Sequence, residues 1–238
     1  MRIGINRKAI AMIELIFAIV IMGIVLMSAP TMISQASMGS MSAVQQEAIA
    51  AGATEISMIM TRAWDENDTN ESDYAPILVV DENITALNED SNNSGKRVGT
   101  PRFSSRSFVT AEGRRLDASS LGVDSDDSGD YDDIDDFDKN TTSLVTSEST
   151  TTEEGDYIDV SLSMEIDITY NNSPNITYTD TNISFDAPFS TTSTDTTNIK
   201  AISVHISSGS NGDTLDTNIT LKSFMCNIGT FELQRRSF

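Results

Sequence analysis

The stretch AIAMIELIFAIVIMGIVLMSAP, residues 9–30, decides how this chain begins, because it is an apolar run that contains a single carboxylate, Glu14. From Ile10 to Ala29 the run is about 20 residues long, which is the length that a helix needs to span a bilayer. A charged side chain at membrane depth costs roughly 2.5–3.5 kcal/mol even on lenient insertion scales. Glu14 therefore requires an explanation that a plain membrane anchor does not supply.

The charges around this run predict its orientation. Three cations precede the run and no acid does, namely Arg2, Arg7 and Lys8. Such an excess of cations marks the cytoplasmic end of a membrane helix, so the rest of the chain would be exported. A signal anchor or an uncleaved secretory signal remains an alternative, although a secretory signal has a shorter apolar core of about 7–15 residues.

The segment IAMIEL, Ile10–Leu15, resembles the N-terminus of type IV prepilins and pseudopilins. The resemblance implies that a prepilin peptidase removes a leader, residues 1–9, by cutting between Ala9 and Ile10, and that the new N-terminus is methylated. Gly23 falls where the family has a glycine, and Pro30 lies one residue before the family's helix-bending proline. Two positions depart from the family, since Ala9 replaces glycine and Ile10 replaces phenylalanine.

The same resemblance gives Glu14 a role in assembly. In the family, the amine freed by cleavage pairs with the glutamate of a neighbouring subunit, so that two charges in the membrane neutralise each other. Removal of one partner of such a pair leaves the other buried, at a cost of several kcal/mol. The implied partners are other pilins or pseudopilins, prepilin peptidase and an inner-membrane assembly platform.

A long helix is predicted to continue beyond the apolar run. Apolar residues recur at helical spacing at Met41, Val44, Ala48, Ala51, Ile56, Ile59, Met60 and Ala63. The predicted helix covers residues 10–64, spans the membrane in its first half and bends at Pro30, because proline removes a helical hydrogen bond.

The C-terminal part of the chain is predicted to form strands. Residues 158–168 alternate between apolar and polar, and residues 176–185, 199–206 and 215–228 give three more candidates. Short segments at 76–80 and 108–109 are weaker candidates, and residues 141–154, rich in Ser, Thr and Glu, are expected to form a linker or long loop. Strands that follow one helix favour an α+β fold, here a pilin-like one in which an antiparallel sheet in the head, residues 65–238, packs on the helix.

An acidic loop, residues 124–138, contains nine aspartates in fifteen residues. Its spacing resembles the start of a calcium-binding loop, in which a glycine permits the sharp turn. The candidate ligands are Asp124, Asp126, Ser128, Asp130 and Asp135. A solvated acidic loop, or aspartates that cap turns, is the alternative interpretation.

Part of the head resembles the MshD-like minor pilins of the mannose-sensitive haemagglutinin pilus. The resemblance rests on DDIDDF, residues 132–137, and on two terminal strand segments, residues 200–204 and 219–227. It covers about fifty residues, whereas the prepilin resemblance rests on the first thirty.

Composition weighs against several functions. The formal net charge is −21, and removal of a leader with three cations would bring it to −24. Such a chain repels nucleic acid, and its basic residues between Lys96 and Arg115 are expected to lie on a solvated loop or to pair with the acidic segments of the same chain. The single cysteine, Cys226, precludes an internal disulfide and is expected to be a buried thiol. An enzyme is not expected, because the only histidine, His205, lies in a strand pattern and no nucleophile or phosphate-binding motif accompanies it.

These observations favour a minor pilin or pseudopilin, a structural subunit of a type IV pilus or a type II secretion pseudopilus. It would cross the bacterial inner membrane once, with its N-terminus cytoplasmic and its head periplasmic, before joining the filament. The alternative is a membrane-anchored, calcium-dependent binding module or adhesin that does not polymerise.

Overall fold

The computed structural model describes residues 7–69, 75–92, 95–123, 131–145, 161–172, 191–208 and 218–230. The elements are helices α1 (Arg7–Ile59) and α2 (Glu66–Thr69), a 3-10 turn η1 (Asp135–Phe137) and strands β1 (Thr141–Val145), β2 (Ser161–Asn171), β3 (Ile199–Ser208) and β4 (Ile219–Cys226). The chain divides into two compact units, residues 1–47 and 48–238, and the division falls within α1.

The first unit consists of the N-terminal part of α1. Every side chain from Ala11 to Ser40 is exposed, although most of those before Pro30 are apolar. The helix continues through Pro30. One helix of the described chain, α1, is therefore long and apolar enough to cross a membrane.

In the second unit, the last turns of α1 pack on the sheet. Ala48, Gly52, Ile56 and Ile59 are buried, and their spacing of three and four residues places them on one face of the helix. A Cβ atom added to Gly52 would lie 2.8 Å from the Cδ1 atoms of both Ile206 and Leu221. Glycine therefore lets the helix backbone approach β3 and β4 closely.

The helix ends at Ile59, so the predicted end at residue 64 was five residues too late. Met60, Thr61 and Arg62 still donate to carbonyl groups of the preceding turn, but at Ala63 the backbone bonds to a distant segment. The Ala63 N–H donates to Asp132 O at 3.3 Å, and the Ile134 N–H donates to Ala63 O at 3.1 Å. These bonds hold the acidic segment 131–138 against the end of the helix.

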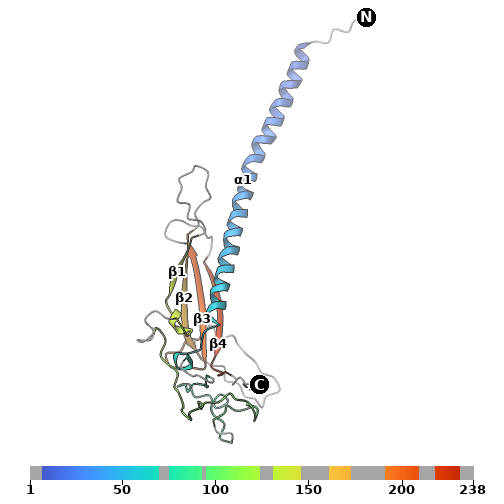
Figure 1. Cartoon of the computed structure of the whole chain (residues 1–238). Helices are drawn as coiled ribbons and strands as arrows, with labels where there is room; N and C mark the ends of the chain where they lie inside the picture. The colour runs from blue at the N-terminus through green and yellow to red at the C-terminus, as the bar shows by residue number, and fades with distance from the viewer. Residues whose placement is uncertain are drawn as a thin grey trace, which may run out of the picture. The chain divides into compact units, whose positions relative to one another are not determined.

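The four described strands form one antiparallel sheet in the order β1-β2-β3-β4, as the arrows in Figure 1 show. The α+β fold predicted from the sequence is thereby confirmed. Alternate residues of β2 and β3 fill one face of the sheet, where Ile166 lies opposite Val204 and Ile168 lies opposite Ile202. All four of these side chains are at most 1% exposed.

Four of the expected elements differ from the structure or lie outside it. Residues 141–145, predicted to belong to a linker, form edge strand β1, because Thr and Val favour extended structure and pair with β2. Residues 76–80 and 108–109 form no strand, and Val79 makes only an isolated bridge to Asp117. The candidate strand 176–185 lies outside the described residues.

Candidate functional site

The N-terminal helix carries an unusually isolated charge. Between residues 9 and 46, Glu14 is the only charged side chain in the sequence, and it is exposed on α1. Ile10 precedes Glu14 by four residues, about one helical turn, so both lie on the same face of the helix. Gly23 also lies on α1, and no atom lies within 4 Å of a Cβ added there.

The hydroxyl groups at the end of the apolar run are satisfied within the helix. Ser28 Oγ donates to Val25 O at 2.9 Å, and Thr31 Oγ1 donates to Ser28 O at 2.7 Å. In an apolar solvent, polar groups must be paired internally, and bonds to a preceding carbonyl achieve this. The segment around Pro30 is thus compatible with a membrane environment.

A buried lysine forms the second notable site. Lys200, on β3, has a fully buried side chain, and its Nζ lies 3.0 Å from Asp65 Oδ2, 2.5 Å from Asp135 Oδ1 and 2.9 Å from Trp64 O. The same Nζ lies 4.5 Å from the ring centre of Trp64 and 5.3 Å from that of Tyr170. We call Lys200, Asp65, Asp133 and Asp135 the buried lysine cluster.

Asp65 is held by several donors besides Lys200. Ser119 donates to its carboxylate from both N and Oγ, at 3.0–3.2 Å, and the Asn67 N–H donates at 3.2 Å. These bonds join the turn after α1 to the segment around Ser119.

Burial controls the protonation of the other acids. Desolvation, with a further contribution from Asp135, raises the pKa of Asp133 to about 8. Desolvation, with Asp65 beside it, raises the pKa of Asp68 to about 7. Burial alone would lower the Lys200 pKa, but Asp135 and Asp65 outweigh that effect and raise it. At neutral pH the cluster therefore contains an ammonium group and a protonated carboxyl, that of Asp133.

The described part of the acidic loop is largely buried. Asp133 Oδ1 accepts from the N–H groups of Asp135 and Asp136 at 2.8 and 3.1 Å, and Asp136 Oδ2 accepts from the N–H of Asp132 at 3.1 Å. Aspartates therefore cap turns here, which is one of the alternatives considered for this loop.

Only one of the five predicted calcium ligands can be placed. Asp124, Asp126, Ser128 and Asp130 lie outside the described residues, and Asp135 binds Lys200. Within the described ranges, no three carboxylate, thiol or imidazole groups gather as a metal site. Where a cation would balance Asp65 and Asp135, the structure has the ammonium group of Lys200.

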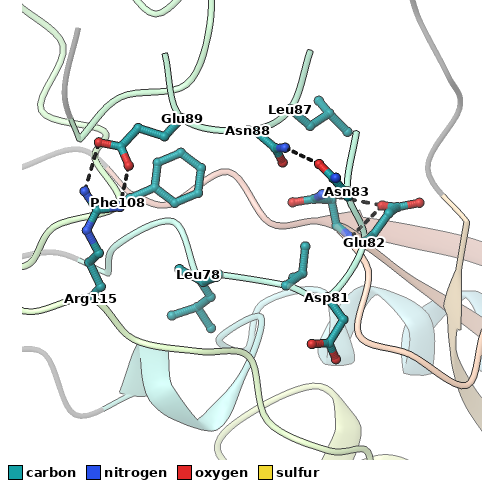
Figure 2. Close-up of a pocket in the computed structure, with 12 residues that line it drawn as sticks. Leu78, Asp81, Glu82, Asn83, Leu87, Asn88, Glu89, Phe108 and Arg115 are labelled. Carbon is teal, nitrogen blue, oxygen red and sulfur yellow. Dashed lines mark hydrogen bonds and ion pairs between the residues drawn. The ribbon is translucent and has the colours of Figure 1, made fainter. Parts of the chain in front are cut away.

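A shallow pocket of about 310 Å³ lies elsewhere in the head. Figure 2 shows Glu89 and Arg115 facing each other at one end and Asn83 beside Asn88 at the other. Arg115 forms an ion pair with Glu89, and the Asn88 amide donates to Asn83 Oδ1 at 2.7 Å. Because these polar groups already bind one another, the pocket does not present an unsatisfied set of ligand contacts.

The remaining candidates have structural surroundings. Arg97, from the basic segment, donates to the backbone oxygens of Leu87 and Asn227 at 2.7 and 2.8 Å. Cys226 is half-buried, and burial raises the pKa of its thiol. His205 is exposed on β3, with its Nδ1 3.1 Å from Thr220 Oγ1.

Comparisons with protein-family models, with curated proteins and with solved structures give no significant match to this chain.

The buried lysine cluster was missed in the sequence analysis, although a signal for Lys200 exists. In the pattern of β3, residues 202, 204 and 206 are apolar and face the core, and Lys200 has the same parity. A lysine in phase with a buried face needs a buried partner. No comparable pattern identifies Asp65, because it follows the helix in a turn.

Proposed function

We propose that this protein is a minor pilin or pseudopilin, anchored in the bacterial inner membrane by α1 and assembled through it into a type IV pilus or a type II secretion pseudopilus. The proposal includes cleavage between Ala9 and Ile10, an N-terminus on the cytoplasmic side and a periplasmic head. It is carried by one observation, the isolated carboxylate of Glu14 on an exposed apolar helix.

The physical argument concerns how Glu14 could be tolerated in a membrane. An unpaired charge there costs roughly 2.5–3.5 kcal/mol, and the apolar segment of the same chain offers no cation to offset it. The α-amino group of Ile10, freed by cleavage, is mostly cationic near neutral pH. Within one helix this amine points along the N-terminal turn, but the amine of a second subunit can approach Glu14 from the side. Assembly thereby removes two unfavourable charges together.

The arrangement of the fold supports the same proposal. The exposed apolar part of α1 supplies a membrane and subunit contact, while its last turns, from Ala48, belong to the head. On a soluble monomer, an exposed apolar surface that extends along a helix in this way would be an interaction site. The acidic head, in a chain of net charge −21, remains soluble and does not favour nucleic acid.

The first test is mass spectrometry of the N-terminus of the membrane-extracted chain, expressed with and without a prepilin peptidase. A chain that begins at Ile10, only when the peptidase is present, supports the proposal. A chain that still begins at Met1 with an active peptidase, or one cut near Ala29, contradicts it.

The second test separates assembly from display at the membrane. We expect Glu14→Ala to abolish co-purification with partner pilins while the chain stays in the membrane fraction. Glu47→Ala, which removes an exposed acid of the same helix outside the apolar run, is the matched control and should assemble normally. Normal assembly of Glu14→Ala would favour the anchored binding module that does not polymerise.

A further inference from the structure

The closest contact within the buried lysine cluster joins two segments that are far apart in the sequence. Lys200 Nζ, on β3, lies 2.5 Å from Asp135 Oδ1, on η1, and 65 positions separate the two residues. The Lys200 side chain is fully buried and that of Asp135 is 2% exposed. Water therefore has almost no access to either group.

A third group, the carboxyl of Asp133, lies beside this pair. The carboxyl groups of Asp133 and Asp135 hydrogen-bond to each other, and burial keeps Asp133 protonated at neutral pH, since its pKa is raised to about 8. The Asp133 Oδ1 atom is fixed by the N–H groups of Asp135 and Asp136. A protonated carboxyl is thus held against the carboxylate that contacts the lysine.

The surroundings keep water away from this pair of charges. The rings of Trp64 and Tyr170 flank the Lys200 ammonium and exclude water from it. Buried ions lose their hydration, and their mutual attraction often only balances that loss. A neutral amide in the same place would remove both charges, and the water released by its formation could leave the dry interior.

We infer that Lys200 and Asp135 condense spontaneously to an intramolecular isopeptide bond, with Asp133 as the group that transfers protons. The Nζ–Cγ bond forms and one Cγ–O bond of Asp135 breaks. The ammonium and the carboxylate together become an amide and one molecule of water, so charge and atoms balance without an oxidant, a cofactor or an activating nucleotide. The Lys200 ammonium first gives one proton to the Asp135 carboxylate, which frees the amine to attack Cγ. Asp133 then donates a second proton to the departing hydroxyl, which leaves as water, and regains one from the nitrogen.

Asp65 is the less suitable of the two carboxylates for this reaction. Three donors from Asn67 and Ser119 already hold its oxygens in place, and its Oδ2 lies farther from Lys200 Nζ than Asp135 Oδ1 does, at 3.0 against 2.5 Å. It also stays hydrogen-bonded after the reaction, because the new amide N–H can donate to it or to Trp64 O, which now lie 3.0 and 2.9 Å from Nζ. Loss of the ammonium therefore does not leave Asp65 without donors.

The test is the intact mass of the full-length chain, purified in detergent and denatured before measurement. We expect a mass lower than that of the sequence, counted from the N-terminus actually present, by one water. Cleavage after Lys, Arg and Glu should then yield fragment 116–139 joined to fragment 166–222, which is uncut at Lys200. These two fragments are not adjacent in the chain, so no missed cleavage between them gives the same mass.

Three variants test the role of each residue in this reaction. Lys200→Arg should show the full sequence mass, and Lys139→Arg, which changes an exposed lysine, should still lose one water. Asp133→Asn should slow the mass loss; an unchanged rate would contradict its role in proton transfer. A folded wild-type chain, with Trp64 protected from quenchers, that keeps its full mass and releases fragment 166–200 would overturn the inference. This result is independent of cleavage at Ala9 and of assembly, so the inference and the proposed function can fail separately.

Discussion

The side chain of Asn227 hydrogen-bonds to both backbone polar groups of Leu78. Its Oδ1 accepts from Leu78 N at 3.0 Å, and its Nδ2 donates to Leu78 O at 2.8 Å. The two residues are 149 positions apart, and both are buried. One amide thus gives Leu78 the two bonds that a neighbouring strand would otherwise supply.

Asn227→Ala should lower the free energy of unfolding of the head by about 2–4 kcal/mol, because each buried polar group left unpaired costs about 1–3 kcal/mol. The fluorescence of Trp64, the only tryptophan and a buried one, reports unfolding in urea. Asn172→Ala, at an exposed position, is the control and should change the midpoint little. Equal midpoints for the two variants would contradict the role of Asn227.

Lys200→Met should destabilise the head by about 3–5 kcal/mol, since it removes the buried nitrogen that both Asp65 and Asp135 contact and leaves these polar groups without that partner. Lys222→Met, at an exposed position of β4, should stay within about 0.5 kcal/mol of the wild type. Urea unfolding followed through Trp64 measures both. Equal unfolding midpoints for Lys200→Met and the wild type would contradict a stabilising role for these buried contacts.

Stability should fall as the pH rises from about 4 to about 8. The pKa of Asp133 is raised to about 8 in the folded state and is about 3.9 in an unfolded chain. Between these values the folded chain holds one more proton, so stability decreases with pH, by at most about 1.4 kcal/mol per unit for one group. Asp68, with a pKa of about 7, acts in the same direction up to that pH.

Asp133→Asn isolates this effect, because an amide resembles the protonated carboxyl but does not titrate. The variant should show a shallower decline of the urea midpoint between pH 5 and pH 8, as measured by Trp64 fluorescence at each pH. The matched control is Asp195→Asn, an exposed acid, which should keep the wild-type slope. If both variants keep that slope, Asp133 is ionised in the folded state at neutral pH.

Gly52→Leu should destabilise the head by about 1–3 kcal/mol, because its side chain would occupy the space of Ile206 and Leu221. Gly39→Leu places the same side chain on the same helix where no atom lies within 4 Å, so the unfolding of the head should not change. The comparison cancels the difference in helix propensity between glycine and leucine. Similar midpoints for the two variants would show that α1 does not approach the sheet at Gly52.

Regular patterns made part of the fold predictable from the sequence. Alternation in residues 199–206 corresponds to β3, and apolar spacing at Ala48, Ile56 and Ile59 corresponds to the buried face of α1. These signals are local, since each follows from the period of one element. The end of the helix could not be found in this way, because it depends on bonds between Ala63 and a segment about 70 residues later.

The site residues differ in the same way, since some can be recognised in the sequence and others come together only in the folded chain. Glu14 was identified because a charge in an apolar run is visible without a structure. The partners of Lys200 were not, since Asp65 and Asp135 come from a turn and a 3-10 segment that meet β3 only in the folded chain. Nothing in the spacing of the acidic loop distinguishes Asp135 from its eight neighbouring aspartates.

The close approach at Gly52 also sets an order of events during synthesis. Leu221, which covers this helical face, leaves the ribosome 169 residues after Gly52, and β4 is the last of the described strands to be made. In the nascent chain, the apolar face of α1 at Ala48 and Ile56 therefore stays uncovered until β4 has been made. During this interval the exposed apolar surface favours aggregation. A premature stop before β4 should consequently lower the abundance of the protein through aggregation and proteolysis, before any defect in its activity could be seen.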